Sequence, residues 1–501
     1  MDMDDDAFYR AFSTRDARFD GRVFVGVKTT GIYCRPICPA RTPKRENVTF
    51  FTSAFAAQEA GFRPCLRCRP ETSPDLAAWR GTSNTVSRAL ALIEEGALDV
   101  GDVDTLAGRL GVGERQLRRL FNEHLGASPV AVAQTRRVLL AKQLLQETRL
   151  PMTEVALAAG FGSVRRFNET FQQLFHRPPA TLRRLGGGEI SASDGGAVSV
   201  TLAYKPPYDW DAMTAFLAGR AIAGVEMVSD DHYARSFSVD GACGVLRIAP
   251  AAPGALKMTV WCDRLQALPA IIARARRVFD LAADPQQIGE HLSKDPWLAP
   301  LVVARPGLRA PGAWDGFELA VRAILGQQVT VGAARGLAGK LAARFGTELD
   351  DPAARELGLT HVFPGPDRLI GQDIAALGMP QARGRALEAM AQAAQADPGL
   401  FGPQRSLETA IARLRALPGV GEWTAQYIAL RALREPDAFP HADVGLMRAM
   451  AGPDGVRPTP DELLVRAERW RPWRAYGAQH LWAADPVPTP ERKKSNDKEA
   501  A

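Results

Sequence analysis

The sequence predicts a multidomain α+β protein with four folded domains: a small α/β domain, an all-α domain, a small α+β domain and a larger all-α domain. First, a chain of 501 residues is too long for one hydrophobic core. Second, four of its six cysteines lie within the first 70 residues. Third, apolar residues recur at spacings of three and four over 83–185, which is typical of helices, and the long stretch from Trp314 to about Trp482 is rich in Ala and Leu and also predicts helices.

Changes in composition along the chain place the boundaries between these domains. The stretch "RVFVGVKTTGIYC" is rich in β-branched and aromatic residues, so we expect strand, turn and strand there. Gly and Ser dominate residues 186–199, which are typical of a flexible linker, and the polar C-terminus is typical of a disordered tail. The expected domains are residues 1–78, 83–185, 200–310 and 311–485, with the linker at 186–199 and the tail at 486–501.

Composition and charge narrow the class of protein. Hydrophobic residues make up 46% and charged residues 24%, no apolar run could span a bilayer, and the acidic start does not resemble a signal peptide. We therefore expect a soluble cytoplasmic protein without a membrane partner. Residues 1–185 carry 27 basic and 20 acidic residues, whereas the remainder carries 35 and 36. This uneven charge favours nucleic acid as the partner of the first third, although a solvated basic surface is the simpler alternative.

The clustered cysteines have the spacing of a metal site. Cys34 and Cys38 are separated by three residues, and Cys65 and Cys68 by two. Two such pairs in an intracellular chain favour one tetrahedral zinc ion over disulfides. An inert structural zinc site is the default interpretation of such a cluster. The two isolated cysteines, Cys243 and Cys262, are expected to be small buried residues.

An internal repeat predicts two helix-turn-helix motifs. Residues 106–129 align with residues 156–179, so that Arg115 matches Arg165, and Phe121 matches Phe171. Each copy predicts a short helix, a turn with Gly, and a second helix that begins after Gly113 or Ser163, both suitable N-caps. A long helix over 130–147 joins the copies, which could therefore enter successive major grooves of DNA.

A glycine hairpin marks the second all-α domain. "LPGVGEWTAQYIALRAL" places Gly419 and Gly421 directly before a helix. The sequence lacks the third glycine of a dinucleotide site, whereas a glycine hairpin between helices can hold a DNA phosphate with its backbone N–H groups. Asp443 follows 22 residues after Gly421. From the sequence alone, a lone Asp in "HADVG" is most simply a helix N-cap.

The cysteine-bearing stretch "TTGIYCRPICPAR…KRENVTFF…AGFRPCLRCRPE" resembles the methylphosphotriester-repair domain of the bacterial Ada family over residues 3–75. The resemblance implies one zinc ion held by the four cysteines, with Cys34 as the thiolate that takes a methyl group from a DNA phosphotriester. Zinc keeps thiolates deprotonated at neutral pH, so this chemistry is physically consistent. Seven basic residues flank the cluster: Arg35, Arg41, Lys44, Arg45, Arg63, Arg67 and Arg69. Of these, Arg45 is expected to contact DNA.

Methylation would also change the charge of this site. Zinc with four thiolates carries two net negative charges, and methylating one thiolate removes one of them. The repulsion from DNA phosphates then falls, so we expect DNA affinity to rise and repair to double as a switch for transcription.

The repeat region resembles the AraC-family DNA-binding domain, which also follows the zinc domain in Ada proteins. The resemblance implies that the second helix of each repeat reads operator DNA, with RNA polymerase as a further partner. Arginine can read guanine, and glutamine or asparagine can read adenine, although a phosphate contact is an equal alternative for each arginine. The expected DNA-reading residues are Arg115, Gln116, Arg118 and Arg119 on the first helix and Arg165, Arg166 and Asn168 on the second. The intervening Leu117, Leu120, Phe121, Phe167 and Phe171 are expected in the core.

The last 300 residues resemble helix-hairpin-helix DNA glycosylases of the AlkA type. The shared motifs are "AYKPPYDWDAMTAFLAGRAIAGVE", "AILGQQVTV" and "RPWRAYGAQHLW", in this order. The resemblance implies that Asp443 stabilises an oxocarbenium-like transition state while an alkylated purine leaves, after the base has been flipped from the duplex. It also implies that Trp423, Tyr427 and Trp482 form an electron-rich pocket for the base. No cofactor is expected for this half.

Four departures refine the expectation. Related enzymes that also cut the backbone carry a lysine where this chain has Trp423, so we expect no lyase activity. The apolar wedge of the family corresponds to Gln328, a polar residue. The Pro-Cys-His-Arg motif of the second Ada alkyltransferase is absent, and no cysteine lies beyond Cys262 to hold an iron–sulfur cluster.

Together these motifs predict a monomeric bacterial fusion protein that repairs methylphosphotriesters at Cys34, excises alkylated purines through Asp443 and activates repair genes once methylated. The main alternative is a methyl-sensing transcription factor whose C-terminal half only binds DNA. A second alternative is a DNA glycosylase whose N-terminal half only tethers it to DNA. A third, a lyase for oxidised bases, is opposed by Trp423.

Overall fold

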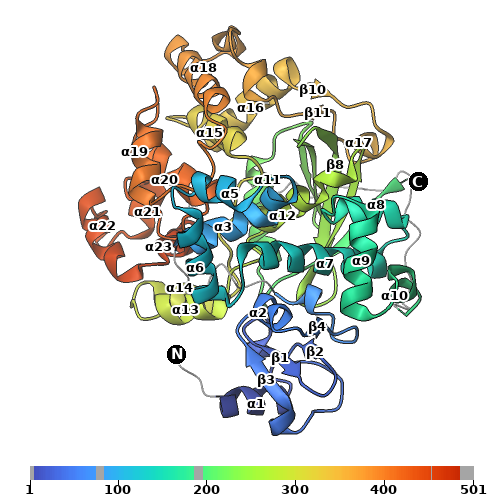
Figure 1. Cartoon of the computed structure of the whole chain (residues 1–501). Helices are drawn as coiled ribbons and strands as arrows, with labels where there is room; N and C mark the ends of the chain where they lie inside the picture. The colour runs from blue at the N-terminus through green and yellow to red at the C-terminus, as the bar shows by residue number, and fades with distance from the viewer. Residues whose placement is uncertain (1–4, 75–83, 186–195, 453, 486–501) are drawn as a thin grey trace, which may run out of the picture.

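The computed structural model describes residues 5–74, 84–185, 196–452 and 454–485 (Figure 1). The expected tail and residues 186–195 of the expected linker lie outside this part of the chain. The C-terminal end of the linker differs from expectation, because Val198 and Ser199 already belong to strand β5 (Val198–Ala203). Val198 is buried at 1% exposure, so its side chain belongs to the core rather than to a linker.

The N-terminal domain contains the expected strand, turn and strand. β1 (Phe24–Val27) pairs antiparallel with β2 (Ile32–Cys34), and the chain reverses through Gly31 in the left-handed region. The four-stranded sheet has the order β3-β1-β2-β4, in which β2 and β4 are parallel. The remaining elements are α1 (Asp5–Ser13), β3 (Val48–Phe51), α2 (Ala54–Glu59) and β4 (Arg63–Pro64).

The next domain is all-helical and contains both predicted helix-turn-helix motifs. Gly113 and Ser163 are the N-caps of their second helices, and the Ser163 side chain accepts a hydrogen bond from the Arg166 N–H. The predicted joining helix is α7, which begins at Pro129 and ends at Glu147. The other helices are α3 (Asn84–Glu94), α4 (Ala97–Val100), α5 (Val103–Arg109), α6 (Glu114–Leu125), α8 (Met152–Ala158), α9 (Val164–Phe175) and α10 (Pro179–Leu185).

A five-stranded antiparallel sheet with the order β5-β9-β8-β7-β6 forms the third domain. Its apolar face packs against α11 (Trp210–Arg220) and α12 (Leu268–Val278) in one hydrophobic cluster. The remaining strands are β6 (Glu226–Val228), β7 (Tyr233–Val239), β8 (Ala242–Pro250) and β9 (Ala255–Cys262).

The last domain is built around α15 (Gly316–Leu325), a helix that is apolar on nearly every side and buried in the core. Two short paired strands, β10 (Thr347–Glu348) and β11 (His361–Val362), interrupt the expected helical region. The longer helices of this region are α13 (Pro285–Leu292), α14 (Leu298–Ala304), α16 (Val331–Phe345), α18 (Gln381–Ala396), α19 (Leu407–Arg415), α20 (Glu422–Arg431), α21 (Val444–Ala449), α22 (Pro460–Ala467) and α23 (Arg474–Ala484). Helices α13 and α14 precede α15 in the chain but pack against α21, α22 and α23.

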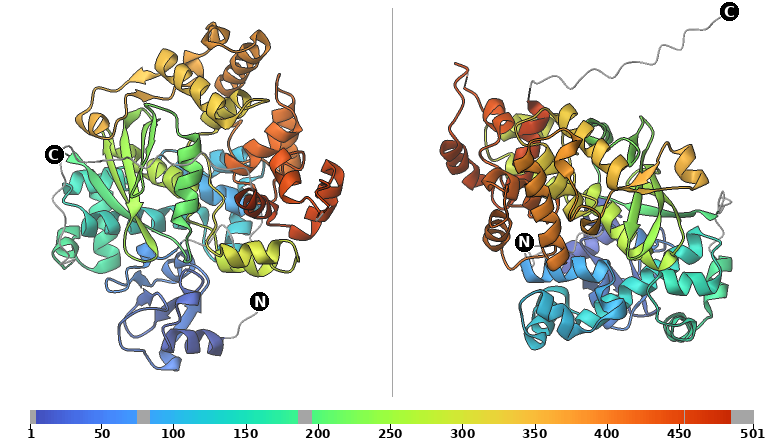
Figure 2. Two further views of the ribbon diagram at one scale, coloured as in Figure 1. Left: turned by 180° about the vertical axis from the view of Figure 1, so that it is seen from behind. Right: turned by 90° about the horizontal axis from the view of Figure 1, so that it is seen from above.

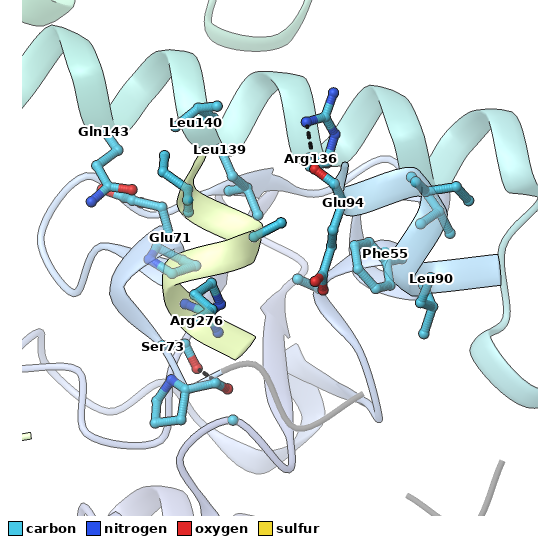
Figure 3. Close-up of a pocket in the computed structure, with 18 of the residues that line it drawn as sticks. Phe55, Glu71, Ser73, Leu90, Glu94, Arg136, Leu139, Leu140, Gln143 and Arg276 are labelled. Atoms are coloured by element: carbon cyan, nitrogen blue, oxygen red, sulfur yellow. Dashed lines mark hydrogen bonds between the residues drawn. The ribbon is translucent and has the colours of Figure 1, made fainter. Parts of the chain in front are cut away.

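Buried polar contacts join the domains. The N-terminal domain lies at one end of the molecule, and α7 runs between it and the rest (Figures 1 and 2). Glu71 forms an ion pair with Lys142 of α7, and both side chains are almost completely buried. Glu147, at the end of α7, binds Arg69 and accepts a hydrogen bond from the Thr201 N–H of β5. A cavity of about 180 Å³ lies at this junction, with Glu71 and Gln143 on its wall (Figure 3).

The two isolated cysteines are placed differently from expectation. Cys243 is exposed near the start of β8, and Cys262 at the end of β9 is half-buried. Alternating residues of a strand face opposite sides of the sheet, so a cysteine near a strand end can face solvent as readily as the core. Within the described residues, no helix combines the length and hydropathy that are needed to cross a membrane.

Candidate functional sites

The four N-terminal cysteines form one compact cluster. Cys34 is the last residue of β2, and Cys65 follows β4, so the parallel pairing of these strands brings the two residues together. The Cys65 N–H donates to the Tyr33 carbonyl over 3.0 Å and holds this arrangement. Cys38 and Cys68 come from the loops that follow, and all four Sγ atoms lie within 4.8 Å of one another.

The surroundings of the cluster suit a metal cation. The Arg35 N–H donates to Cys68 Sγ and the Arg67 N–H to Cys65 Sγ, each over 3.3 Å, and such donors stabilise thiolates. Contact with the other thiols, Cys38 first, and burial raise the pKa of the Cys34 thiol. Four thiolates at this spacing therefore require a cation, and a set of four sulfur ligands is typical of zinc. Cys34 is 6% exposed, much like the other three.

The basic residues around the cluster have different roles. Arg35 is buried and binds Asp20, the Cys68 carbonyl and Thr72, so it supports the fold instead of facing DNA. Arg69 is engaged by Glu71 and Glu147. Arg45 pairs with Asp5 and Asp6 near the N-terminus. Of the seven basic residues that flank the cysteines, Arg41, Lys44 and Arg67 are exposed, while Arg63 is half-buried.

The predicted DNA-reading side chains face solvent. Arg115, Gln116, Arg118 and Arg119 are exposed on α6, and Arg165, Arg166 and Asn168 are exposed on α9. Arg118 and Arg165 form ion pairs with glutamates one turn away on the same helices. The residues that were expected in the core are buried, except that Leu120 is only partly buried.

The glycine hairpin between α19 and α20 is exposed, and its conformation explains its glycines. Gly419 has φ of 78°, and a Cβ at this position would lie 2.6 Å from the Cβ of Ala386. Gly421 is the N-cap of α20, so the N–H groups of the first turn of the helix point out of the hairpin. This arrangement can accept a phosphate oxygen through the backbone alone.

Asp443 lies beside a group of aromatic side chains, and its carboxylate accepts three hydrogen bonds. As the N-cap of α21, its Oδ1 accepts from the Leu446 N–H over 3.1 Å. The indole N–H groups of Trp482 and Trp423 donate to Oδ1 over 2.9 Å and to Oδ2 over 2.7 Å. Asp443 is therefore a helix cap and also a carboxylate that two pocket aromatics hold in one orientation.

The three predicted aromatic residues lie together. The rings of Trp423 and Tyr427, one turn apart on α20, are stacked with centroids 5.2 Å apart and an interplanar angle of 9°. The Tyr427 and Trp482 rings meet edge to face at 6.4 Å. The indole N–H bonds to Asp443 orient both tryptophans, so the carboxylate and the rings form one site.

The structure adds four residues to this site that the sequence interpretation missed. Phe216 and Arg220 reach it from α11 of the preceding domain, where Arg220 and Arg431 of α20 both lie over the Phe216 ring. Gln327 donates from its side-chain amide to the Gly419 carbonyl over 2.8 Å and to Thr424 over 3.1 Å, which ties the α15–α16 loop to the hairpin. All four lie within the sequence motifs "FLAGRA", "AILGQQ" and "LPGVGEWTAQYIALRAL", so the motifs themselves could have indicated them.

Gln328, the expected wedge residue, is exposed in the loop between α15 and α16. Its φ of 56° lies in the left-handed region, which is unusual for a residue other than glycine and is often found at functional loops. Val329 and Val331 beside it are 37% and 51% exposed, so the loop also presents apolar surface.

Helix α23, which carries Trp482, also contains the buried His480, which makes the stability of the folded protein sensitive to pH. Burial, together with the positive charge of Arg305, lowers the pKa of His480 to about 4, and a hydrogen bond to the Leu301 backbone offsets this in part. The unfolded chain binds a proton at His480 below about pH 6.5, whereas the folded chain does not until about pH 4. The stability that His480 contributes is therefore complete above pH 6.5 and is lost as the pH falls towards 4.

We expect the variant His480→Gln to show a shallower loss of stability in acid than the wild type. The difference in the free energy of unfolding between pH 7 and pH 4.5 should shrink by on the order of 2–3 kcal/mol. Urea unfolding of both proteins at several pH values measures it. Equal slopes for the two proteins would contradict the account.

Comparisons with known proteins identify the domains and the family of this chain. Three family models match: the metal-binding domain of Ada at residues 7–71, a helix-turn-helix domain at 106–185 and the AlkA N-terminal domain at 199–315. The chain is 41% identical to a probable bifunctional transcriptional activator/DNA repair enzyme AlkA of Mycobacterium tuberculosis, over 96% of this chain and 97% of the relative. Together with the four grouped thiols, the Ada model assigns one zinc ion to Cys34, Cys38, Cys65 and Cys68.

The C-terminal half has its own relatives. It is 38% identical to DNA-3-methyladenine glycosylase 2 of Escherichia coli, over 56% of this chain and 96% of the relative. A solved 3-methyladenine DNA glycosylase from Archaeoglobus fulgidus shares the fold, with a TM-score of 0.51 at 20% identity over 57% of this chain and 98% of that one.

Proposed function

Because this chain belongs to the family of bifunctional transcriptional activators and DNA repair enzymes, we propose that it repairs alkylated DNA at two separate sites, Asp443 and Cys34. The observation that carries the proposal is the Asp443 carboxylate, held by two indole N–H groups beside the stacked Trp423 and Tyr427 rings. A binding module would not need an oriented carboxylate beside stacked aromatic rings. The alternative of a C-terminal half that only binds DNA is therefore less well supported.

At the aromatic site, the reaction is hydrolysis of the N-glycosidic bond of an alkylated purine. The flipped base stacks on Trp423, Tyr427 and Trp482, whose electron-rich faces attract the positive charge of bases such as 3-methyladenine. As the C1′–N bond breaks, its electron pair leaves with the base, and positive charge develops on the sugar near Asp443. Water then adds at C1′ and gives up a proton. The Gly419–Gly421 hairpin holds a neighbouring phosphate, and Gln328 occupies the space that the base leaves in the duplex.

At the thiol cluster, the reaction is a stoichiometric transfer of one methyl group. Zinc, when bound, keeps the four sulfurs deprotonated at neutral pH. Cys34 Sγ attacks the methyl carbon of a DNA methylphosphotriester, so that an S–C bond forms, the C–O bond breaks and a phosphodiester anion leaves. Exposed Arg41, Lys44 and Arg67 attract the DNA backbone to this end of the molecule.

The two helix-turn-helix motifs complete the function as a transcriptional activator. The exposed residues of α6 and α9 bind promoter operator DNA, and the loss of one negative charge at Cys34 strengthens this binding. We assign the repair and regulatory roles to residues 1–78 and 83–185 respectively, and base excision to residues 200–485. The proposed partners are damaged duplex DNA, operator DNA and RNA polymerase, and the protein acts as a monomer in the bacterial cytoplasm.

Incubation of the purified chain with methylated duplex DNA tests the proposal. We expect free 3-methyladenine in the supernatant, abasic sites in the DNA and an uncut backbone, because Trp423 occupies the position where a lyase needs a lysine. Borohydride added during the reaction should trap no covalent protein–DNA adduct. Absence of released base would leave the alternative, a C-terminal half that only binds DNA.

A further inference from the structure

A buried guanidinium lies next to the aromatic rings of this site and has no acidic partner among the described residues. Arg431 is 2% exposed, and its Nη1 and Nη2 donate to the Pro311 carbonyl and to Gln479 Oε1, each over 2.9 Å. In the part of the chain that the structure describes, no carboxylate lies within ion-pair distance of it. Burial lowers the pKa of Arg431 to about 10, so the side chain still carries its charge at neutral pH. An uncompensated buried charge is costly and often marks function.

The aromatic rings surround this charge. The guanidinium carbon lies 4.6 Å from the ring centroid of Phe216, 5.0 Å from that of Trp482 and 5.6 Å from that of Tyr427. Burial alone would raise the pKa of Tyr427, but the positive charges of Arg431 and Arg220 outweigh it and lower that pKa. Two arginines therefore place positive charge next to the rings that are proposed to hold the base.

The two charges of the site lie at opposite ends of one row of side chains. Trp423, Tyr427 and Arg431 are spaced four residues apart on α20, so they stand on one face of the helix. Asp443 is bonded to the first of them, and Arg431 lies two turns further along, about 12 Å by helical rise. A base stacked on these rings thus lies between a carboxylate on the sugar side and a guanidinium on the base side.

This field matches the movement of electrons in glycosidic cleavage. The electron pair of the C1′–N bond moves into the base, so positive charge shifts towards the sugar and Asp443. For a base that leaves without a positive charge of its own, negative charge builds up on the base side, where the guanidinium stabilises it. For a cationic base, the guanidinium repels the bound substrate and weakens its cation–π attraction to the rings.

From this arrangement, and resting on the proposed glycosylase function, we infer that Arg431 is a positioning residue that sets the preference of the pocket between neutral and cationic bases. It acts through the aromatic rings and the field across them. It promotes the departure of neutral damaged bases and lowers the affinity of the site for cationic bases.

The test compares Arg431→Met, which removes the charge at similar length, with Arg431→Lys, which keeps it. Single-turnover and steady-state base release are measured on two duplexes that differ only in the target base, cationic 7-methylguanine or neutral hypoxanthine. For R431M we expect KM for 7-methylguanine to fall and kcat for hypoxanthine to fall, so that the ratio of kcat/KM (cationic over neutral) rises on the order of tenfold. R431K should keep the wild-type ratio.

The outcomes separate this inference from the function on which it rests. Release of neither base by the wild type overturns both. If the wild type releases both bases and R431M and R431K lose kcat/KM for both bases by the same factor, Arg431 is only structural. That result overturns this inference but leaves the proposed glycosylase function intact. If circular dichroism shows that R431M is unfolded, Arg431→Gln, which keeps a donor for the Pro311 carbonyl, replaces it with the same expected ratio.

Discussion

Replacing Asp443 by asparagine is expected to lower base release by at least about a thousandfold while the protein stays folded. The carboxylate supplies the negative charge that stabilises the developing positive sugar, and loss of such a group costs about 4 kcal/mol of transition-state stabilisation. The two carboxylate oxygens of Asp443 accept from two indole N–H groups and one backbone N–H. Asparagine has only one acceptor oxygen, so the orientation of the side chain is lost as well. Single-turnover release of 3-methyladenine from methylated duplex measures the effect.

The fold should survive because asparagine is also a good N-cap, and the Leu446 N–H can keep its acceptor. Asp351→Asn is the matched control, since Asp351 is likewise an N-cap aspartate, on α17 (Pro352–Glu356). We expect D351N to release base at the wild-type rate and D443N to bind duplex DNA as the wild type does. An active D443N would show that Asp443 is only a helix cap.

The second large effect is expected at the thiol cluster. After reaction with methylated DNA, one methyl group per chain should be found on the peptide that contains Cys34, and Cys34→Ala should take up none. Mass spectrometry of the digested protein measures both. Cys243→Ser is the matched control, because Cys243 is the exposed cysteine and would be the first to react if access to solvent decided the acceptor. A methyl group on another cysteine would contradict the assignment.

Methylation of Cys34 should also strengthen operator binding. The site loses one negative charge, and the effect should shrink as salt rises because it is electrostatic. Titration of operator duplex with methylated and unmethylated protein at two salt concentrations measures it. Equal affinities at low salt would exclude the charge switch.

Local patterns predicted much of this molecule. The spacing of Cys34, Cys38, Cys65 and Cys68 indicated one metal site because the spacing of metal ligands is set within short loops. The parallel pairing of β2 and β4 then brings the two pairs of cysteines together. Trp423 and Tyr427 could be placed on one helix face because they are four residues apart.

Contacts between distant segments could not be predicted in this way. Nothing in the local sequence around Asp443 indicates that two indoles donate to it, because Trp482 comes from another helix. The approach of Phe216 and Arg431 depends on how two domains pack. The expectation that Cys243 is buried was wrong because the composition of a strand does not reveal which end residue faces solvent.

The central claim is that one chain carries two independent repair reactions. It is tested most directly by adding a small amount of protein to excess methylated duplex that contains both methylphosphotriesters and 3-methyladenine, and following the protein mass and the free base together. We predict that the protein gains one methyl group at Cys34 and then stops, while base release continues through many turnovers. Base release that ceases when the protein is methylated, or a protein that reacts in only one of the two ways, would contradict the account.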